Sequence, residues 1–122
     1  MSKKVLVVDD SATVRQQVGT ALTQAGFTVI EAVDGIDGAA RIAATSDLAL
    51  VICDVNMPRM NGLEMVESVR TNPAAAAMPI IMLTTEGDPT LVARAKQAGA
   101  KGWIVKPFKP ELLVAAAKKL AV

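Results

Sequence analysis

Polar residues able to do chemistry stand directly after four separate apolar runs of the chain. In chain order they are Asp9 and Asp10, then Asp54, Thr84 and Lys106. Three carboxylates placed close together repel one another, and a hard divalent cation such as Mg²⁺ relieves that repulsion. Carboxylates, Mg²⁺ and a lysine ammonium together form a receptor for a phosphoryl group. A carboxylate oxygen in such a site can attack phosphorus and give an acyl phosphate.

This chemistry requires the four positions to meet in space, and the pattern of elements predicts that they do. Five apolar runs alternate with five helical patterns. The predicted strands are Val5–Val8, Phe27–Ile30, Leu50–Cys53, Pro79–Leu83 and Trp103–Val105, and the helical patterns start near Val14, Ile36, Leu63, Leu91 and Pro110. Unbroken apolar runs are typical of strands covered on both faces, and strand–helix alternation predicts a parallel sheet. Ligands bind such sheets at the carboxyl ends of the strands, where these polar residues fall. Glu31 and Asp34 follow the second run and are expected to lie further away.

Length and composition predict a single domain, residues 1–122, with a hydrophobic core and no output domain. The chain is 52% hydrophobic and 20% charged, with a net charge of +1. This balance argues against nucleic-acid binding and against a polybasic membrane surface. Residues 86–122 are nevertheless basic, which suggests an acidic or amphipathic partner segment. The single cysteine, Cys53, is expected in the core, and with no membrane-spanning run it favours a cytoplasmic protein.

Four stretches resemble the receiver domain of two-component response regulators. They read VLVVDDSATVR from residue 5, LVICDVNMPRMNGLEMV from residue 50, IIMLTTEG from residue 80 and GWIVKPF from residue 102. The likeness covers essentially the whole chain and leans toward the stand-alone chemotaxis regulators. It implies an α/β, flavodoxin-like (βα)5 doubly wound parallel sheet with strand order 2-1-3-4-5.

The resemblance also implies a role for each acid. Asp54 matches the phosphoacceptor, and Asp10 matches a direct Mg²⁺ ligand. Asp9 helps to position the metal, partly through water. Asn56 matches the residue whose backbone carbonyl completes the protein ligands. Taken singly, Asp54 reads as an ordinary turn residue, and Asp9 and Asp10 as helix caps, a role that Ser11 can share.

Further roles follow from the same resemblance. Thr84 matches the switch hydroxyl and Lys106 the cation that contacts the phosphoryl group. Trp103 falls at the aromatic switch position and is expected to rotate inward when Thr84 moves. Asn56 and Glu86 match positions that tune self-dephosphorylation. Pro107 matches a cis peptide of the family.

The implied partners are proteins. A sensor histidine kinase supplies the phosphoryl group, and a target such as a flagellar-motor switch protein reads the changed surface. A phosphatase is possible, and the protein is expected to be a monomer with no enzymatic activity beyond its own phosphorylation and dephosphorylation. Ser11 departs from the chemotaxis type, where a bulky aromatic follows the acid pair, so the target and the phosphatase stay open.

Other functions remain as alternatives. A single-domain phosphorelay protein or a regulator outside motility would carry the same site. A phosphohydrolase using Asp54 as nucleophile lacks a second acid two residues later. A flavin or dinucleotide binder would need a glycine fingerprint that the DDSATVR loop lacks. A docking module that never takes up phosphate would not need the full set of site residues.

Overall fold

The computed structural model describes residues 3–45, 47–54, 62–69, 78–84, 89–106 and 108–121, with only the backbone of residues 62, 63, 68, 69, 84, 89 and 91. Strands and helices alternate along the chain: β1 (Lys4–Val8), α1 (Ala12–Gln24), β2 (Thr28–Ala32), α2 (Gly35–Ala44), β3 (Leu48–Asp54), α3 (Gly62–Val69), β4 (Ile80–Thr84), α4 (Pro89–Gln97), β5 (Gly102–Val105) and α5 (Pro110–Leu120). The predicted order of elements is confirmed. Strand β2 continues to Ala32, two residues beyond the predicted end, so Glu31 lies inside it.

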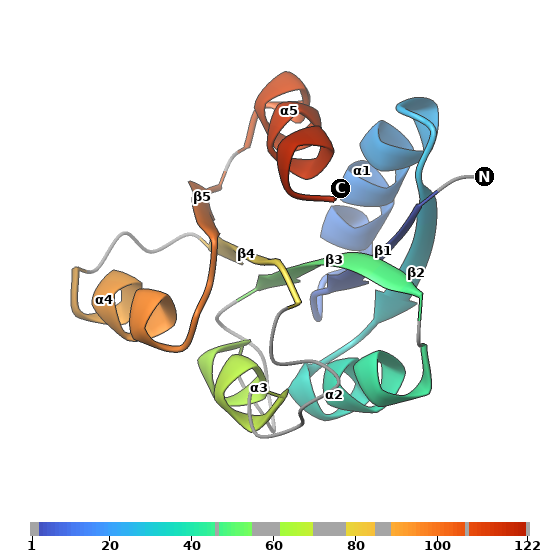
Figure 1. Cartoon of the computed structure of the whole chain (residues 1–122). Coiled ribbons are helices and arrows are strands. Elements are labelled where there is room, and N and C mark those ends of the chain that lie inside the picture. The colour runs from blue at the N-terminus through green and yellow to red at the C-terminus, as the bar shows by residue number, and fades with distance from the viewer. Residues whose placement is uncertain are drawn as a thin grey trace.

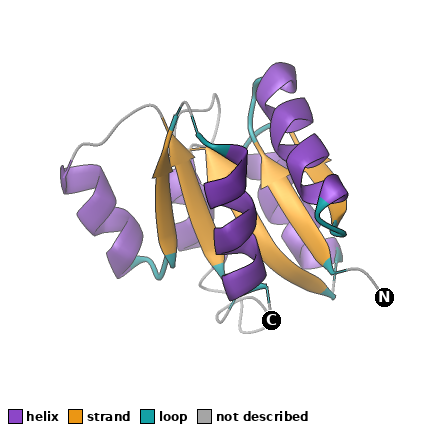
Figure 2. Cartoon of the chain, turned by 90° about the horizontal axis from the view of Figure 1, so that it is seen from above, coloured by secondary structure: helices purple, strands orange, loops and turns teal. Residues whose placement is uncertain are grey.

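The five strands form one sheet in the order β2-β1-β3-β4-β5, and every neighbouring pair is parallel. This is the doubly wound order that the resemblance implied. Helices α1 and α5 cover one face, while α2, α3 and α4 lie on the other (Figure 1). Seen from above, the strands point in one direction between the two layers of helices (Figure 2). All carboxyl ends therefore meet at one edge of the sheet.

Among the described residues, the core forms two apolar clusters, one on each face of the sheet. Strand β1 shows how one run supplies both: Val5 and Val7 join the cluster under α1 and α5, and Leu6 and Val8 join the cluster under α2, α3 and α4. Successive side chains of a strand point to opposite faces, so a strand covered on both sides must be apolar throughout. Cys53 is fully buried in the second of these clusters, as predicted.

Helix ends are set by residues visible in the sequence. The hydroxyl of Ser11 accepts a hydrogen bond from the backbone N–H of Val14 at the start of α1. Past the last turn, Gly26 has a φ of +97°, a left-handed conformation that glycine adopts without strain. Helix α5 begins at Pro110, whose fixed φ suits the first helical position. Within the described ranges, no helix has the length and apolar character needed to cross a membrane.

Candidate functional site

The register of the central strands brings the first acids together. Val8 of β1 pairs with Cys53 of β3, so the residues that follow them, Asp9 and Asp54, lie at the same level of the sheet. Both are buried, Asp9 at 1% and Asp54 at 4% of their accessible surface, whereas Asp10 is exposed. A carboxylate at the end of each buried strand therefore faces its neighbour at the sheet edge.

The same register continues into the basic half of the chain. Asp54 pairs with Leu83 of β4, one residue before Thr84. Thr84 in turn pairs with Val105 of β5, one residue before Lys106. From β1 to β5, each polar position thus lies within one residue of the level of the next. The four strand ends that carry polar residues meet at one edge of the sheet, as predicted.

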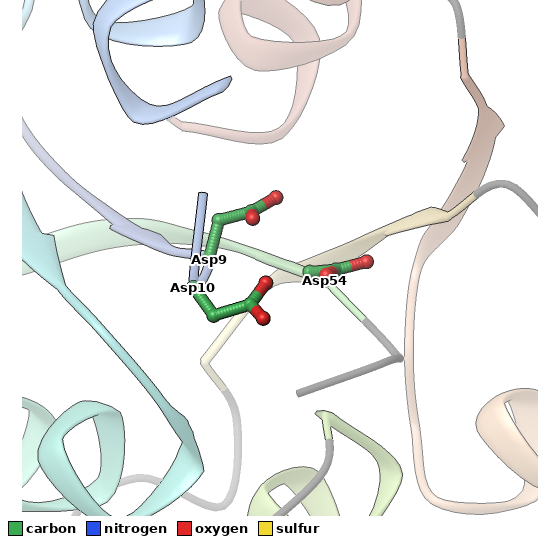
Figure 3. Close-up of side chains that lie close together, drawn as sticks. All are labelled: Asp9, Asp10 and Asp54. Atoms are coloured by element: carbon green, nitrogen blue, oxygen red, sulfur yellow. The ribbon is translucent and has the colours of Figure 1, made fainter. Parts of the chain in front are cut away.

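The three carboxylates converge. One oxygen from each of Asp9, Asp10 and Asp54 lies within 4.8 Å of the others. In Figure 3, Asp9 points to the side of α1 and α5, Asp10 to the side of α2 and α3, and Asp54 lies beside both. Alternation along the chain leaving β1 explains why the two consecutive acids flank Asp54. Oxygen ligands this close suit a hard divalent cation, so the residues fit Mg²⁺.

Lys106 supplies a positive charge to the same cluster. Its Nζ lies 3.0 Å from Oδ2 of Asp9 and 3.4 Å from Oδ1 of Asp54. Burial lowers the pKa of the Lys106 ammonium, but the hydrogen bond to Asp9 and the negative charges of Asp54 and Asp9 outweigh it. The pKa consequently lies above its ordinary value of 10.5. Lys106 is therefore charged at neutral pH and neutralises buried carboxylates that would otherwise repel each other.

Asp9 is held by two protein donors. Its Oδ1 accepts a hydrogen bond of 2.9 Å from the backbone N–H of Ser11, and its Oδ2 accepts the bond from Lys106. Both oxygens of Asp9 are thus already engaged by protein donors. Within the part of the chain that the structure describes, the carboxylate of Asp10 accepts no hydrogen bond and stays open to solvent.

Cys53 directly precedes Asp54 in β3 but takes no part in the chemistry of the site. Its thiol donates to the backbone carbonyl of Asp54 across 3.3 Å and contacts Sδ of Met65 at 3.9 Å. Burial, followed by the charges of Asp54 and Asp9, raises the pKa of the thiol well above 9.0. Cys53 is therefore a neutral packing residue.

Several predicted residues are not tested by this geometry. Asn56, Glu86 and Pro107 lie outside the described residues, and of Thr84 only the backbone is described. Trp103 is half-buried and already packs against the core cluster under α4. Its Nε1 is buried, and no hydrogen-bond partner for it lies among the described residues. The roles of these five residues stay predictions.

Arg15 contacts the site but was not predicted from the sequence. Its guanidinium donates to the backbone carbonyl of Asp9 at 2.7 Å and to Oε1 of Glu31 at 3.0 Å. A signal was present, because Arg15 is the one charged residue between Ala12 and Gln24, in the first turn after the acid pair.

Comparison with known proteins decides the family. A family model described as "Response regulator receiver domain" matches residues 5–118. The chain belongs to this family. As a receiver domain, it is a signalling domain of a response regulator, and its acids lie at the sheet edge where the family resemblance placed them.

Similar proteins come from several bacteria. The receiver domain is 43% identical over 111 residues to "Chemotaxis protein CheY1" of Helicobacter pylori, covering 90% of each chain. It is 45% identical over 111 residues to "Chemotaxis protein CheY homolog" of Campylobacter jejuni, covering 90% of this chain and 85% of that protein. The solved structure of the chemotaxis response regulator CheY4 of Vibrio cholerae superposes with a TM-score of 0.91 at 42% identity, over 98% and 99% of the two chains.

Proposed function

We propose that Asp54 accepts a phosphoryl group from the phosphohistidine of a sensor histidine kinase, and that this switches a protein-binding surface in chemotaxis or motility control. One observation carries the proposal. The buried carboxylate of Asp54 lies at a strand end with the Lys106 ammonium 3.4 Å away and with Asp9 and Asp10 beside it. A carboxylate so placed can attack phosphorus while fixed charges neutralise the phosphoryl oxygens.

The proposed transfer is an in-line displacement. An oxygen of Asp54 forms a bond to phosphorus as the P–N bond to the kinase histidine breaks. The leaving nitrogen keeps the electron pair, and its ring takes up a proton. Lys106 follows the negative charge from the carboxylate to a phosphoryl oxygen. A bound Mg²⁺ would neutralise further phosphoryl charge, held by Asp10 and Asp54 with help from Asp9 and the carbonyl of Asn56.

The acyl phosphate then ends by hydrolysis. Water attacks phosphorus, the bond between phosphorus and the Asp54 oxygen breaks, and free phosphate leaves. Asn56 and Glu86 are proposed to tune this step through the access of water, and a partner phosphatase can accelerate it.

The proposed output surface consists of α4, β5 and α5. Val105 and Leu112 are exposed at 48% and 62%, although both are large apolar residues. These elements and the segments that join them also carry exposed lysines: Lys96, Lys101, Lys109, Lys118 and Lys119. Apolar side chains among positive charges suit an acidic amphipathic segment such as one from a flagellar-motor switch protein. Movement of Thr84 and Trp103 would couple phosphorylation to this surface by shifting a pre-existing equilibrium.

The names of the relatives support the choice of pathway. Proteins named for chemotaxis match nine-tenths of this chain at 43–45% identity. On that basis we propose a chemotaxis regulator that works with a histidine kinase, and separately we propose that it is cytoplasmic and monomeric.

Intact mass spectrometry tests the phosphoacceptor. After incubation with acetyl phosphate and Mg²⁺, the wild-type protein should gain the mass of one phosphoryl group, and Asp54→Asn should gain none. Asp34→Asn is the matched control, since Asp34 is also buried but caps α2 away from the cluster, and asparagine caps equally well. Phosphorylation of Asp54→Asn, or none of the wild type, would contradict the proposal.

A titration tests the output. The protein activated with beryllofluoride should bind an acidic peptide from a motor switch protein more tightly than the untreated protein does. Equal affinities would contradict the switch to a motor target, whereas transfer of the phosphoryl group onward to a histidine phosphotransfer protein would identify a phosphorelay.

A further inference from the structure

Arg15 connects the acid cluster to the edge strand of the sheet. Its side chain is only 15% exposed and extends from the first turn of α1. Nη1 donates to the carbonyl oxygen of Asp9, and Nε donates to the carboxylate of Glu31 in β2. The planar guanidinium makes both contacts at once, which a lysine ammonium cannot reproduce.

The carbonyl of Asp9 stands where sheet pairing ends. The pairing between β1 and β2 stops at Val8 and Ala32. The last backbone hydrogen bond between the two strands runs from the N–H of Asp9 to the carbonyl of Ala32, at 3.1 Å. The next carbonyl group therefore needs a partner from outside the sheet. Arg15 supplies that partner at 2.7 Å.

Fixing this carbonyl also fixes Asp10. The peptide bond between Asp9 and Asp10 is planar, so the carbonyl oxygen of Asp9 and the Cα of Asp10 belong to one rigid unit. Asp10 itself is exposed and, among the described residues, its carboxylate has no hydrogen-bond donor. The hydrogen bond from Arg15 to the Asp9 carbonyl therefore fixes the peptide plane that precedes Asp10, and with it the position of the Asp10 Cα.

Glu31 completes the arrangement. It faces Arg15 from β2 and neutralises its charge, so the guanidinium can approach the acid cluster without strongly repelling a cation. The pair therefore has two effects of opposite sign on a metal ion. The anchored peptide favours binding, and any residual positive charge opposes it.

We propose that Arg15, held by Glu31, is a positioning residue that orients Asp10 for divalent-cation binding. The proposal rests on the proposed function, because it assumes that the acid cluster binds Mg²⁺. It assigns to Arg15 a role in the site without direct contact to the ion. Loss of an outer partner of this kind weakens metal binding about tenfold or more.

The test uses Mn²⁺ as probe, with free Mn²⁺ counted by electron paramagnetic resonance. The decisive variant is Arg15→Met/Glu31→Met, which leaves the net charge unchanged. We expect it to bind Mn²⁺ about tenfold more weakly than wild type. Arg94→Met/Glu67→Met is the matched control, since it removes another Arg–Glu pair, one that joins α3 to α4 through two hydrogen bonds, and it should leave the affinity unchanged.

A second variant keeps the proposal falsifiable if the double variant fails to fold. Arg15→Lys retains the charge but not the two-armed contact, so it should also bind Mn²⁺ more weakly. In nuclear magnetic resonance spectra the amide signal of Asp10 should shift in both Arg15 variants and stay in place in the control. Wild-type affinity in Arg15→Met/Glu31→Met or in Arg15→Lys would overturn the proposal.

Different results would refute the metal site and the positioning role of Arg15. The metal site itself is wrong if the wild-type protein does not bind Mn²⁺ saturably. It is also wrong if Asp10→Asn binds Mn²⁺ as well as wild type does. If wild type binds and the Arg15 variants bind equally well, only the positioning role is wrong.

Discussion

The ammonium of Lys106 donates a hydrogen bond of 3.0 Å to Asp9, although the two residues lie 97 positions apart in the chain. Asp9 is 1% exposed and the Lys106 side chain 17% exposed, so the pair is shielded from water. The contact links the residue that follows β5 to the residue that follows β1, across the carboxyl ends of the strands between them. The Lys106 charge therefore stabilises the buried carboxylates, in addition to the role proposed for it in phosphoryl transfer.

Replacement of Lys106 by methionine should lower the free energy of unfolding. A buried carboxylate loses its partner, which destabilises by about 3–5 kcal/mol in a fully buried pair. Because Lys106 is partly exposed, we expect about 2 kcal/mol, measured by urea denaturation without Mg²⁺. Added Mg²⁺ should recover more stability in Lys106→Met than in wild type, since the ion replaces the lost charge.

Lys101→Met provides the comparison for this experiment. Lys101 is exposed, and its loss should change the unfolding free energy by no more than about 0.5 kcal/mol. A Lys106→Met protein as stable as Lys101→Met would show that the buried carboxylates do not depend on this ammonium.

The sequence predicted the site well because each strand is a continuous apolar run that a polar residue ends. Asp9, Asp54 and Lys106 could therefore be assigned to one edge without coordinates. The contact between Arg15 and Glu31 could not be predicted in this way, because it depends on where β2 ends. A charged residue normally marks the end of an apolar run, yet Glu31 continues the strand, since an edge strand tolerates an exposed charge.

Glycine-to-alanine changes at two helical positions should have opposite effects. A Cβ at Gly38 in α2 would lie 2.7 Å from Sδ of Met65 and 3.0 Å from a methyl group of Val8. At Gly19 in α1 the nearest atom would be 3.7 Å away, an ordinary contact. Alanine improves helix propensity by about 1 kcal/mol at either position, but overpacking costs about 1–3 kcal/mol at Gly38.

We therefore expect Gly19→Ala to raise the unfolding free energy by about 0.5–1 kcal/mol and Gly38→Ala to lower it by about 1 kcal/mol. A double-mutant cycle assigns the cause. In a Met65→Ala background the penalty of Gly38→Ala should shrink, because the clashing sulfur is gone. An unchanged penalty would place the strain at Val8 instead.

The ion pair between Glu67 and Arg94 predicts a pH dependence. Arg94 donates two hydrogen bonds to Glu67, at 2.7 and 3.0 Å, and these lower the pKa of Glu67 below its ordinary 4.5. The folded state therefore binds this proton less readily than the unfolded state. The stabilisation is present above pH 4.5 and disappears as the pH falls through the lowered pKa.

Both side chains are nearly half exposed, so solvent limits the effect to about 0.5 kcal/mol. Glu67→Gln should lower the unfolding free energy by that amount at pH 7, and the difference from wild type should vanish at the acid end of the titration. A difference that persists there would assign the effect to packing rather than to charge.

Cys53 offers a probe of how the site opens. The thiol is fully buried under Asp54, and it is the one cysteine of the chain. In the native protein it should react with a thiol reagent only through openings that expose the β1–β3 region, while in urea it should react at once. If the acids next to Cys53 bind Mg²⁺ as proposed, the ion should slow the reaction in wild type, in proportion to the occupancy of the site. In Asp10→Asn, with a proposed ligand removed, the same Mg²⁺ concentration should slow the reaction far less. Rapid labelling of the native protein would contradict the burial of the thiol. Labelling that Mg²⁺ does not slow in either protein would show that metal binding and exposure of Cys53 are not coupled.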